Sequence, residues 1–186
     1  MINNNYKKAK KIFFDYGGIH SHMGREGYFN EYKSYNVDKE IEKKWGVEFR
    51  NQMLSEIEEL NGSKEVLRKI HKLNAIISQY KDGDGLSLFV LVMRREMQKL
   101  DTFVSLIALE GILGNIKKGI ANNTENIDFC VETLDLIIKN PIKVSAEHFE
   151  GFERAEHLAV ENLIKRIERS KKSALEMKKT VYRESL

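Results

Sequence analysis

The chain has 186 residues, which is enough for one domain with a sizeable core. Its 41% hydrophobic and 32% charged residues are typical of a folded globular protein and exclude an intrinsically disordered one. The single cysteine, Cys130, excludes an internal disulfide and indicates a reducing compartment. The longest apolar run, residues 88–93, is too short to cross a bilayer, and the first residues lack the apolar segment of a secretory signal. We therefore expect a cytoplasmic protein without a membrane partner.

The small net charge of +3 conceals basic ends and an acidic middle. Residues 1–11 contain four lysines and no acidic residue, and residues 165–186 contain eight basic and three acidic residues. A domain that binds duplex nucleic acid needs a concentrated basic face, and an acidic middle repels phosphates. Weak nucleic-acid binding through the basic termini is therefore the least favoured of the three functions that the sequence suggests.

The first predicted element is an amphipathic helix over residues 3–15. Its apolar positions recur at spacings of three and four, and its lysines lie on the opposite side. Gly17 and Gly18 follow directly. Because glycine adopts the left-handed conformation without a side-chain clash, this pair predicts the end of the helix.

Residues 17–35 are the one stretch that does not predict a helix. Within residues 19–23 (IHSHM), His20 and His22 alternate with apolar or small residues, which is the period of a strand. A Gly-Arg-Glu-Gly turn and an aromatic run over residues 28–35 complete the pattern of a β-hairpin. A lone hairpin is marginally stable in water, so we expect this one to pack on the neighbouring helices.

From Asp38 onward the apolar spacing predicts helices that are separated by short polar breaks. A Lys-Asp-Gly-Asp-Gly sequence at residues 81–85 is one such break, and Asp101 is a predicted N-cap. The predicted helices span residues 41–60, 63–77, 86–100, 101–119, 125–140 and 145–183. The single proline, Pro141, agrees with long uninterrupted helices.

These elements predict an all-α single domain over residues 1–186 with a small N-terminal β-hairpin. The helix pairs 63–99 and 101–139 follow each other at about 38 residues, which is near the period of HEAT and armadillo arrays. The two pairs share no residue-by-residue identity. An irregular helical bundle and a short HEAT/armadillo-like array therefore both stay open as interpretations.

Ten of the 17 aromatic residues lie in the first fifty positions. Tyrosines on a hairpin provide large, rigid contacts and are natural interface anchors. In the alternating pattern of a strand, Tyr28 and Tyr32 share one face, and Phe29 and Glu31 share the other. The residues predicted to form a binding surface are His20, His22, Arg25, Glu26, Tyr28, Glu31 and Tyr32.

The favoured hypothesis is a helical module that binds another protein, as an adaptor, an inhibitor or an immunity-type protein. The alternative is a small metal-binding protein or hydrolase in which His20 and His22 hold a metal ion together with Glu26 or Glu31. The chain contains no phosphate-binding loop, nucleophile elbow or CXXC sequence. We therefore predict no catalytic residue and no cofactor, and lean against an enzyme.

Three single features add to this interpretation. Glu110 has apolar neighbours, so we expect a lysine or arginine of a neighbouring helix to pair with it. Cys130 lies in an apolar helical pattern and is predicted to be a buried core thiol. The C-terminal helix has an apolar seam with basic flanks, which favours packing on the protein's own body or on an acidic partner. A homo-oligomer through this helix is the remaining alternative.

Overall fold

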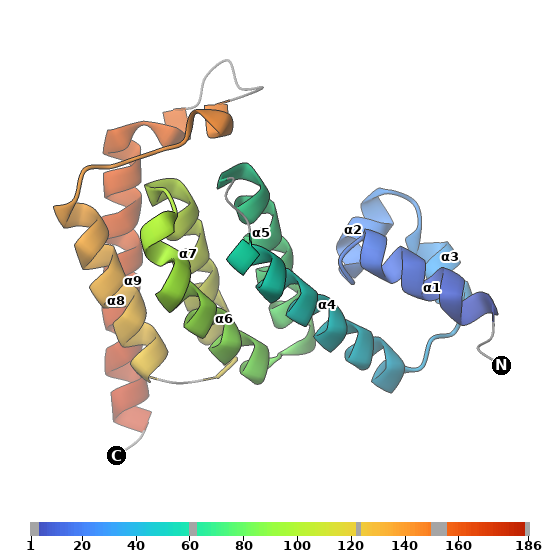
Figure 1. Cartoon of the computed structure of the whole chain (residues 1–186). Coiled ribbons are helices and arrows are strands. Elements are labelled where there is room, and N and C mark those ends of the chain that lie inside the picture. The colour runs from blue at the N-terminus through green and yellow to red at the C-terminus, as the bar shows by residue number, and fades with distance from the viewer. Residues whose placement is uncertain (1–3, 60–62, 122–123, 150–155, 185–186) are drawn as a thin grey trace.

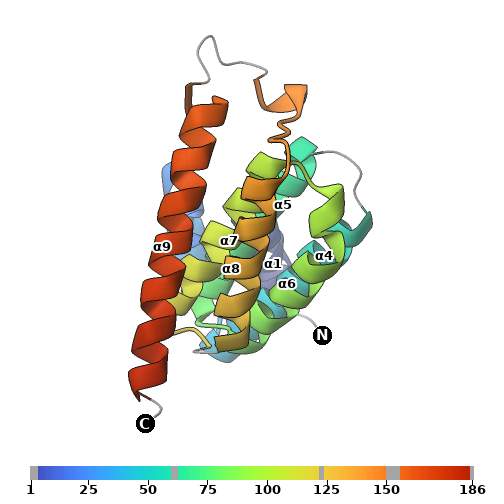
Figure 2. The same ribbon diagram turned by 90° about the vertical axis from the view of Figure 1, so that its left-hand side faces the viewer.

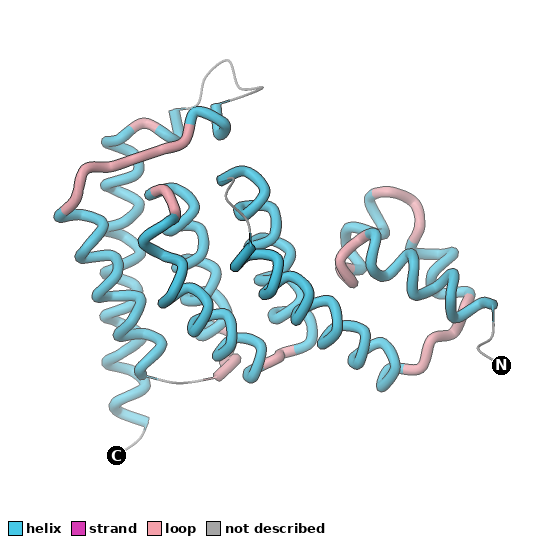
Figure 3. Tube along the Cα trace, viewed as in Figure 1, coloured by secondary structure: helices cyan, strands magenta, loops and turns pink. Residues whose placement is uncertain are grey.

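The computed structural model describes residues 4–59, 63–121, 124–149 and 156–184, and every regular element within these ranges is a helix (Figures 1 and 3). The fold is all-α, as the sequence predicts. The α-helices are α1 (Asn4–Asp15), α2 (His20–Arg25), α3 (Phe29–Ser34), α4 (Lys39–Glu59), α5 (Ser63–Tyr80), α6 (Gly83–Glu96), α7 (Thr102–Lys117), α8 (Thr124–Lys139) and α9 (Val160–Glu184). Short 3-10 turns are η1 (Met97–Lys99), η2 (Ala146–Phe149) and η3 (Glu156–Leu158). None of the helices in these ranges combines the length and the apolar character needed to cross a membrane.

Helices α4 to α9 form two layers (Figures 1 and 2). Helix α6 contacts α4 and α8 in one layer, and α7 contacts α5 and α9 in the other. Successive helices run in opposite directions, so the helices within one layer run parallel (Figure 1). The short helices α1, α2 and α3 lie at one end of this array, where α1 contacts α4.

Helix α7 forms the centre of the core. Most of its residues are buried, and it contacts α5, α6, α8 and α9. A helix with neighbours on several sides has to be apolar all round, which is the pattern that the sequence predicts for this segment. Cys130 on α8 is fully buried, and this burial raises the pKa of its thiol to about 12, so it is the core thiol predicted.

The helices pair differently from the two pairs expected at residues 63–99 and 101–139. The most extensive contacts are those of α8 with α9 and of α4 with α5, and α5 contacts α7 more than it contacts α6. Because α7 is apolar on all sides, it occupies the central place and draws α5 against it. Helices that follow each other in the sequence lie in opposite layers, and α5 also packs beside α7 in its own layer.

Asp82 and Asp101 are the N-caps of α6 and α7. The carboxylate of Asp82 accepts a hydrogen bond from the backbone N–H of Gly85, and that of Asp101 accepts one from Val104, both at 2.9 Å. Such caps satisfy backbone donors that have no partner within the helix. The cap predicted at Asp101 is confirmed, whereas the break predicted at residues 81–85 is limited to residues 81–82, because α6 already begins at Gly83.

The β-hairpin predicted over residues 17–35 is not formed, because α2 and α3 occupy this stretch. Helix α1 ends as predicted, with Gly17 and Gly18 in the left-handed region. Ile19 and Met23 are both buried. Residues four apart share a face in a strand and in a helix, so this short run agrees with either structure. The packing of α2 against α3 and the contact of His20 with Glu42 select the helix.

The C-terminal helix predicted over residues 145–183 begins only at Val160. The preceding segment instead packs against the start of α7, where Nε2 of His148 lies 2.8 Å from a carboxylate oxygen of Asp101. This tertiary contact holds the chain in a 3-10 turn and overrides the local preference for a helix. Residues 150–155 of the predicted helix lie outside the described residues.

Helix α9 packs along α8 within the same chain. Its fully buried seam residues are Leu163, Ile167 and Ala174. The basic flanks of α9 pair with acidic residues of α8: Lys171 with Asp135, and Lys178 with Asp128 at 2.5 Å. The apolar seam and its basic flanks therefore contact the protein's own body, which was one of the two arrangements expected.

Candidate functional site

The residues predicted as a binding surface differ in exposure, and two of them, His20 and Tyr32, contact each other with ring centres 5.8 Å apart. Tyr28 is 43% exposed, whereas Tyr32 is 4% exposed, and its ring lies 6.4 Å from that of Phe13 on α1. Tyr28 and Tyr32 therefore differ in exposure, whereas the strand pattern predicts that they form one set on one face. The predicted residues that are exposed besides Tyr28 are Arg25, Glu26 and Glu31.

The predicted metal site is not assembled. His20 and His22 are two positions apart on α2, and side chains at this spacing point about 200° apart around a helix. His20 faces Glu42 of α4 instead of the predicted ligands Glu26 and Glu31. No group of three His, Cys, Asp or Glu side chains that could hold a metal ion occurs within the described ranges.

Glu42 is the centre of a polar cluster that joins four helices. Nε2 of His20 on α2 lies 2.7 Å from the Glu42 carboxylate, and the hydroxyl of Tyr80 on α5 donates to it at 2.6 Å. The hydroxyl of Tyr32 on α3 is buried beside this carboxylate and contributes to lowering the pKa of Glu42. Burial alone would raise the pKa of Glu42, but the contacts with His20 and Tyr80 outweigh it and lower this pKa. The cluster thus fastens α2 and α3 to the array.

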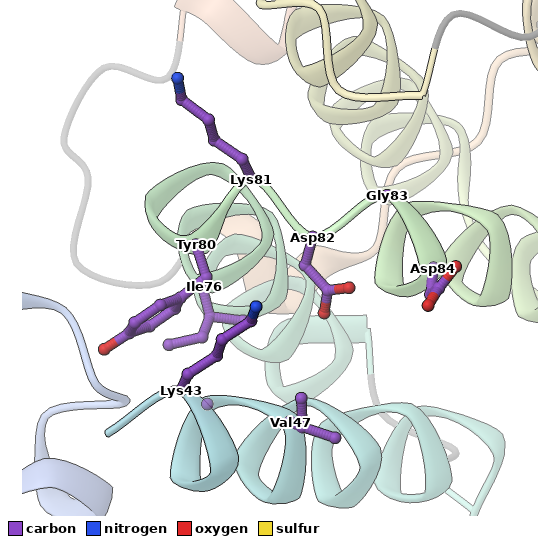
Figure 4. A pocket seen from close by; sticks show the side chains of 9 residues that line it. Lys43, Val47, Ile76, Tyr80, Lys81, Asp82, Gly83 and Asp84 are labelled. Atoms are coloured by element: carbon purple, nitrogen blue, oxygen red, sulfur yellow. The ribbon is translucent and has the colours of Figure 1, made fainter. Parts of the chain in front are cut away.

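Tyr80 also lines a cavity of about 270 Å³ between α4, the end of α5 and the start of α6 (Figure 4). Figure 4 shows the side chain of Lys81 pointing away from this cavity, while Lys43 and Asp82 extend toward it. Asp82 accepts a hydrogen bond of 2.5 Å from the guanidinium of Arg50. Since Asp82 also caps α6, its charge serves to fix the start of α6 on α4, which is a structural role.

Replacing Glu42 with glutamine is expected to remove part of the pH dependence of the free energy of unfolding at acidic pH. The folded-state pKa of Glu42 lies below its ordinary value of 4.5, so its stabilisation is present above about pH 4.5 and is lost as the pH falls through the lower folded value. The difference in unfolding free energy between wild type and Glu42→Gln should therefore shrink below about pH 4.5. Urea denaturation at several pH values measures it.

Glu40 is the matched control for this experiment, because it is an exposed carboxylate on the same helix. The Glu40→Gln variant makes the same change of charge without the contacts to His20 and Tyr80. A difference between wild type and Glu42→Gln that stays constant with pH would contradict this electrostatic role of the cluster.

A larger cavity, of about 710 Å³, lies where the end of α6 and η1 meet α7 and α8. Its apolar lining consists of Met97, Leu100, Phe129, Leu136, Ile137 and Pro141. A second hollow of about 600 Å³ between α6 and α8 shares Arg94, Phe129 and Glu132 with it. We call the two together the α6–α8 groove, since they are adjacent and share these lining residues.

Three leucines of the α6–α8 groove are open to solvent. Leu88 and Leu91 on α6 are 40% and 52% exposed, and Leu136 on α8 is 59% exposed. Covering such side chains is favourable, and apolar surface that is gathered in one hollow marks an interaction site more often than scattered apolar residues do. The groove is therefore a place where a second molecule would gain free energy by binding.

Arg94 is an exposed residue that lines both hollows of the α6–α8 groove. Its guanidinium lies 4.7 Å from the ring centre of Phe129 and donates to the backbone oxygen of Glu125 at 3.2 Å. A cation stacked on an aromatic ring in this way stabilises the contact between the two helices. Arg94 therefore fixes the width of the groove by tying α6 to α8.

The sequence pattern predicted neither the Glu42 cluster nor the α6–α8 groove. Residues 86–93 are apolar almost all round, which is typical of a buried helix. In the structure, however, α6 exposes Leu88 and Leu91 to solvent. The sequence signal for the groove was the excess of apolar residues in this helix, because a helix with a solvent-facing side needs only one apolar stripe. Glu42 was part of the polar side of a predicted helix, and nothing in its spacing indicated its partners.

The Glu42 cluster and the α6–α8 groove differ in what their side chains contact. The groups around Glu42 contact one another within the protein, whereas the leucines of the α6–α8 groove face solvent. The groove is therefore the better candidate for a functional surface. Comparison with protein families, curated proteins and solved structures gives no match for this chain, so the assignment is based on the geometry of the site.

Proposed function

We propose that the protein is a helical protein-binding module and that the α6–α8 groove binds a helical segment of another protein. The observation that carries this proposal is the set of exposed leucines in the α6–α8 groove, with Leu88 and Leu91 in one hollow and Leu136 in the other. Covering one such leucine contributes about 1.5 kcal/mol or more. An adaptor, an inhibitor and an immunity-type protein can all use a surface of this kind.

The dimensions of the groove support a helix as the bound element. The lining residues on α8 extend from Glu125 to Ile137, which corresponds to about 18 Å, or roughly three turns of a partner helix. Leu88 and Leu91 lie one turn apart on the facing helix. Amphipathic helices bind in such grooves through apolar residues that repeat at spacings of three and four.

The location of the protein is part of the same proposal. Cys130 is fully buried, and its thiol pKa is raised, so the one thiol is neutral and protected at neutral pH. A lone unpaired cysteine supports a reducing compartment. We therefore propose that the protein and its partner are cytoplasmic.

Leu91→Asp and Leu136→Asp are each expected to weaken partner binding about 30-fold, which corresponds to about 2 kcal/mol per anchor residue. Both leucines are more than half exposed, so the melting temperature should stay nearly the same. The partner is isolated with the wild-type chain from cells that produce it, and its dissociation constant is then measured by calorimetry for each variant.

Leu175→Asp on α9 is the matched control, because Leu175 is a 40% exposed leucine outside the α6–α8 groove. This variant should bind the partner like the wild type. If the Leu91→Asp and Leu136→Asp variants retain full binding, or if Leu175→Asp weakens binding equally, the groove is not the docking surface.

A further inference from the structure

We infer that the larger hollow of the α6–α8 groove is a binding site for a small neutral molecule with an apolar body and one hydrogen-bonding group, such as a hydroxyl. This hollow of about 710 Å³ lies where the end of α6 and η1 meet α7 and α8, and we call it the η1 hollow. Ligand sites have volumes of about 300–1,000 Å³, apolar walls and a few polar groups. The inference goes beyond the proposed function, because it assigns the buried part of this hollow to a second kind of ligand.

The apolar lining of the η1 hollow can hold the body of such a molecule. Met97 and Leu100 line it on one side, and Phe129 and Ile137 of α8 line it on the other. These four side chains are partly or almost fully buried, whereas Leu136 of the same lining is 59% exposed. An apolar ring that contacts them leaves water, which favours binding roughly in proportion to the apolar area that is covered.

Three hydroxyl side chains in the lining have hydrogen-bonding capacity that the protein does not use. Ser105, Thr102 and Thr133 are 3%, 9% and 8% exposed. The Thr102 hydroxyl oxygen accepts a hydrogen bond of 3.0 Å from the backbone N–H of Lys143, so its own proton is available. The Thr133 hydroxyl donates to the backbone oxygen of Phe129 at 2.7 Å, so its oxygen can still accept. The Ser105 hydroxyl makes no hydrogen bond with the described residues.

These hydroxyls define the polar group of the ligand. A buried hydroxyl without a partner costs free energy, so a ligand group that pairs with Ser105 gains from the contact. The group has to be neutral, because no charged side chain of the lining is buried and an unpaired charge is costly to bury. The charged residues of the lining, Arg94, Glu132 and Lys143, are all exposed and of both signs, so they do not select a charged ligand.

Three compounds with the same naphthalene ring test this inference: 2-naphthol, 2-methylnaphthalene and 2-naphthoate. They place a hydroxyl, a methyl group or a carboxylate at the same ring position. Titration of the full chain, followed by the fluorescence of each compound, should show 2-naphthol binding about fivefold more tightly than 2-methylnaphthalene. It should bind at least about tenfold more tightly than 2-naphthoate, because the carboxylate has to lose its water without gaining a buried cation.

Two pairs of variants locate the site. Ser105→Ala should remove the preference for 2-naphthol over 2-methylnaphthalene, whereas Ser87→Ala, at an exposed serine of the other hollow, should keep it. Leu136→Asp introduces a charge into the lining of the η1 hollow and should weaken the binding of 2-naphthol and 2-methylnaphthalene alike, by about tenfold. Leu91→Asp is its matched control and should leave both affinities unchanged, because Leu91 lines the other hollow.

The other outcomes overturn the inference. Tighter binding of 2-naphthoate would show that the exposed cations Arg94 and Lys143 hold an anion instead. Equal weakening by Leu91→Asp and Leu136→Asp would show that the compounds adhere to exposed leucines without using the η1 hollow. If 2-naphthol does not bind, or binds Ser105→Ala as it binds the wild type, the buried hydroxyls do not form a site. None of these results concerns the protein partner, whose binding is tested separately with Leu91→Asp, so the proposed function can stand or fail without this inference.

Discussion

Replacing Arg50 with alanine is expected to lower the free energy of unfolding by about 3–5 kcal/mol, because it breaks a buried ion pair from one side. The Arg50 side chain is 8% exposed and the Asp82 side chain 19%. Arg50 also donates to the side chain of Asn51. In the Arg50→Ala variant the Asp82 carboxylate would remain partly buried without this cation. Chemical denaturation followed by circular dichroism measures the change.

Arg95→Ala is the matched control for this prediction, because Arg95 of α6 pairs with Glu58 and thus joins the same two helices. Its side chain is 56% exposed, and pairs open to solvent contribute about 0.2–1 kcal/mol. The two variants should therefore differ by several-fold in their effect. Similar losses from Arg50→Ala and Arg95→Ala would mean that burial of the first pair has no energetic consequence.

Replacing Gly18 with alanine is expected to destabilise the protein by about 3 kcal/mol, through backbone strain and overpacking together. Gly18 has φ +67°, a conformation that alanine adopts only with strain. An added Cβ would also lie 2.6 Å from Cδ1 of Ile76 and closer still to the ring of Phe13. Both neighbours are core residues, so neither can move aside at low cost.

Gly27→Ala separates these two contributions. Gly27 has φ +81°, and a Cβ added there meets no atom within 4 Å, so its substitution introduces strain without a clash. We expect a loss of about 1 kcal/mol for Gly27→Ala, measured by the same denaturation experiment. Equal losses in the two variants would indicate that the close approach of Gly18 to the core carries no cost.

The Glu42 cluster and the α6–α8 groove belong to different parts of the array (Figure 1). The cluster connects the short helices α2 and α3 to α4 and α5, whereas the groove opens between α6 and α8. The predicted effects can therefore be tested separately. Changes at Glu42 should alter stability and leave partner binding intact, while changes at Leu91 and Leu136 should do the reverse.

The amino-acid sequence by itself determines where most helices lie and where they end. The apolar spacing over long segments predicts the helices from α4 to α8, and Asp101 marks one of the helix starts. The pairing expected for Glu110 is also present, since Arg166 donates to its carboxylate at 2.7 Å. These features are local, or follow from the cost of an unpaired buried charge, so they need no knowledge of the fold.

Only the tertiary structure decides the remaining features. Residues 19–23 agree with a strand and with a helix, and the packing of α2 against α3 together with the contact of His20 with Glu42 selects the helix. Residues 146–149, which were predicted to belong to the C-terminal helix, instead form a 3-10 turn that the contact between Asp101 and His148 holds in place. The α6–α8 groove arises because the neighbouring helices cover only part of α6, so part of its all-round apolar surface faces solvent. A sequence pattern gives the period of a helix, but which of its faces are covered depends on neighbours that come from distant parts of the chain.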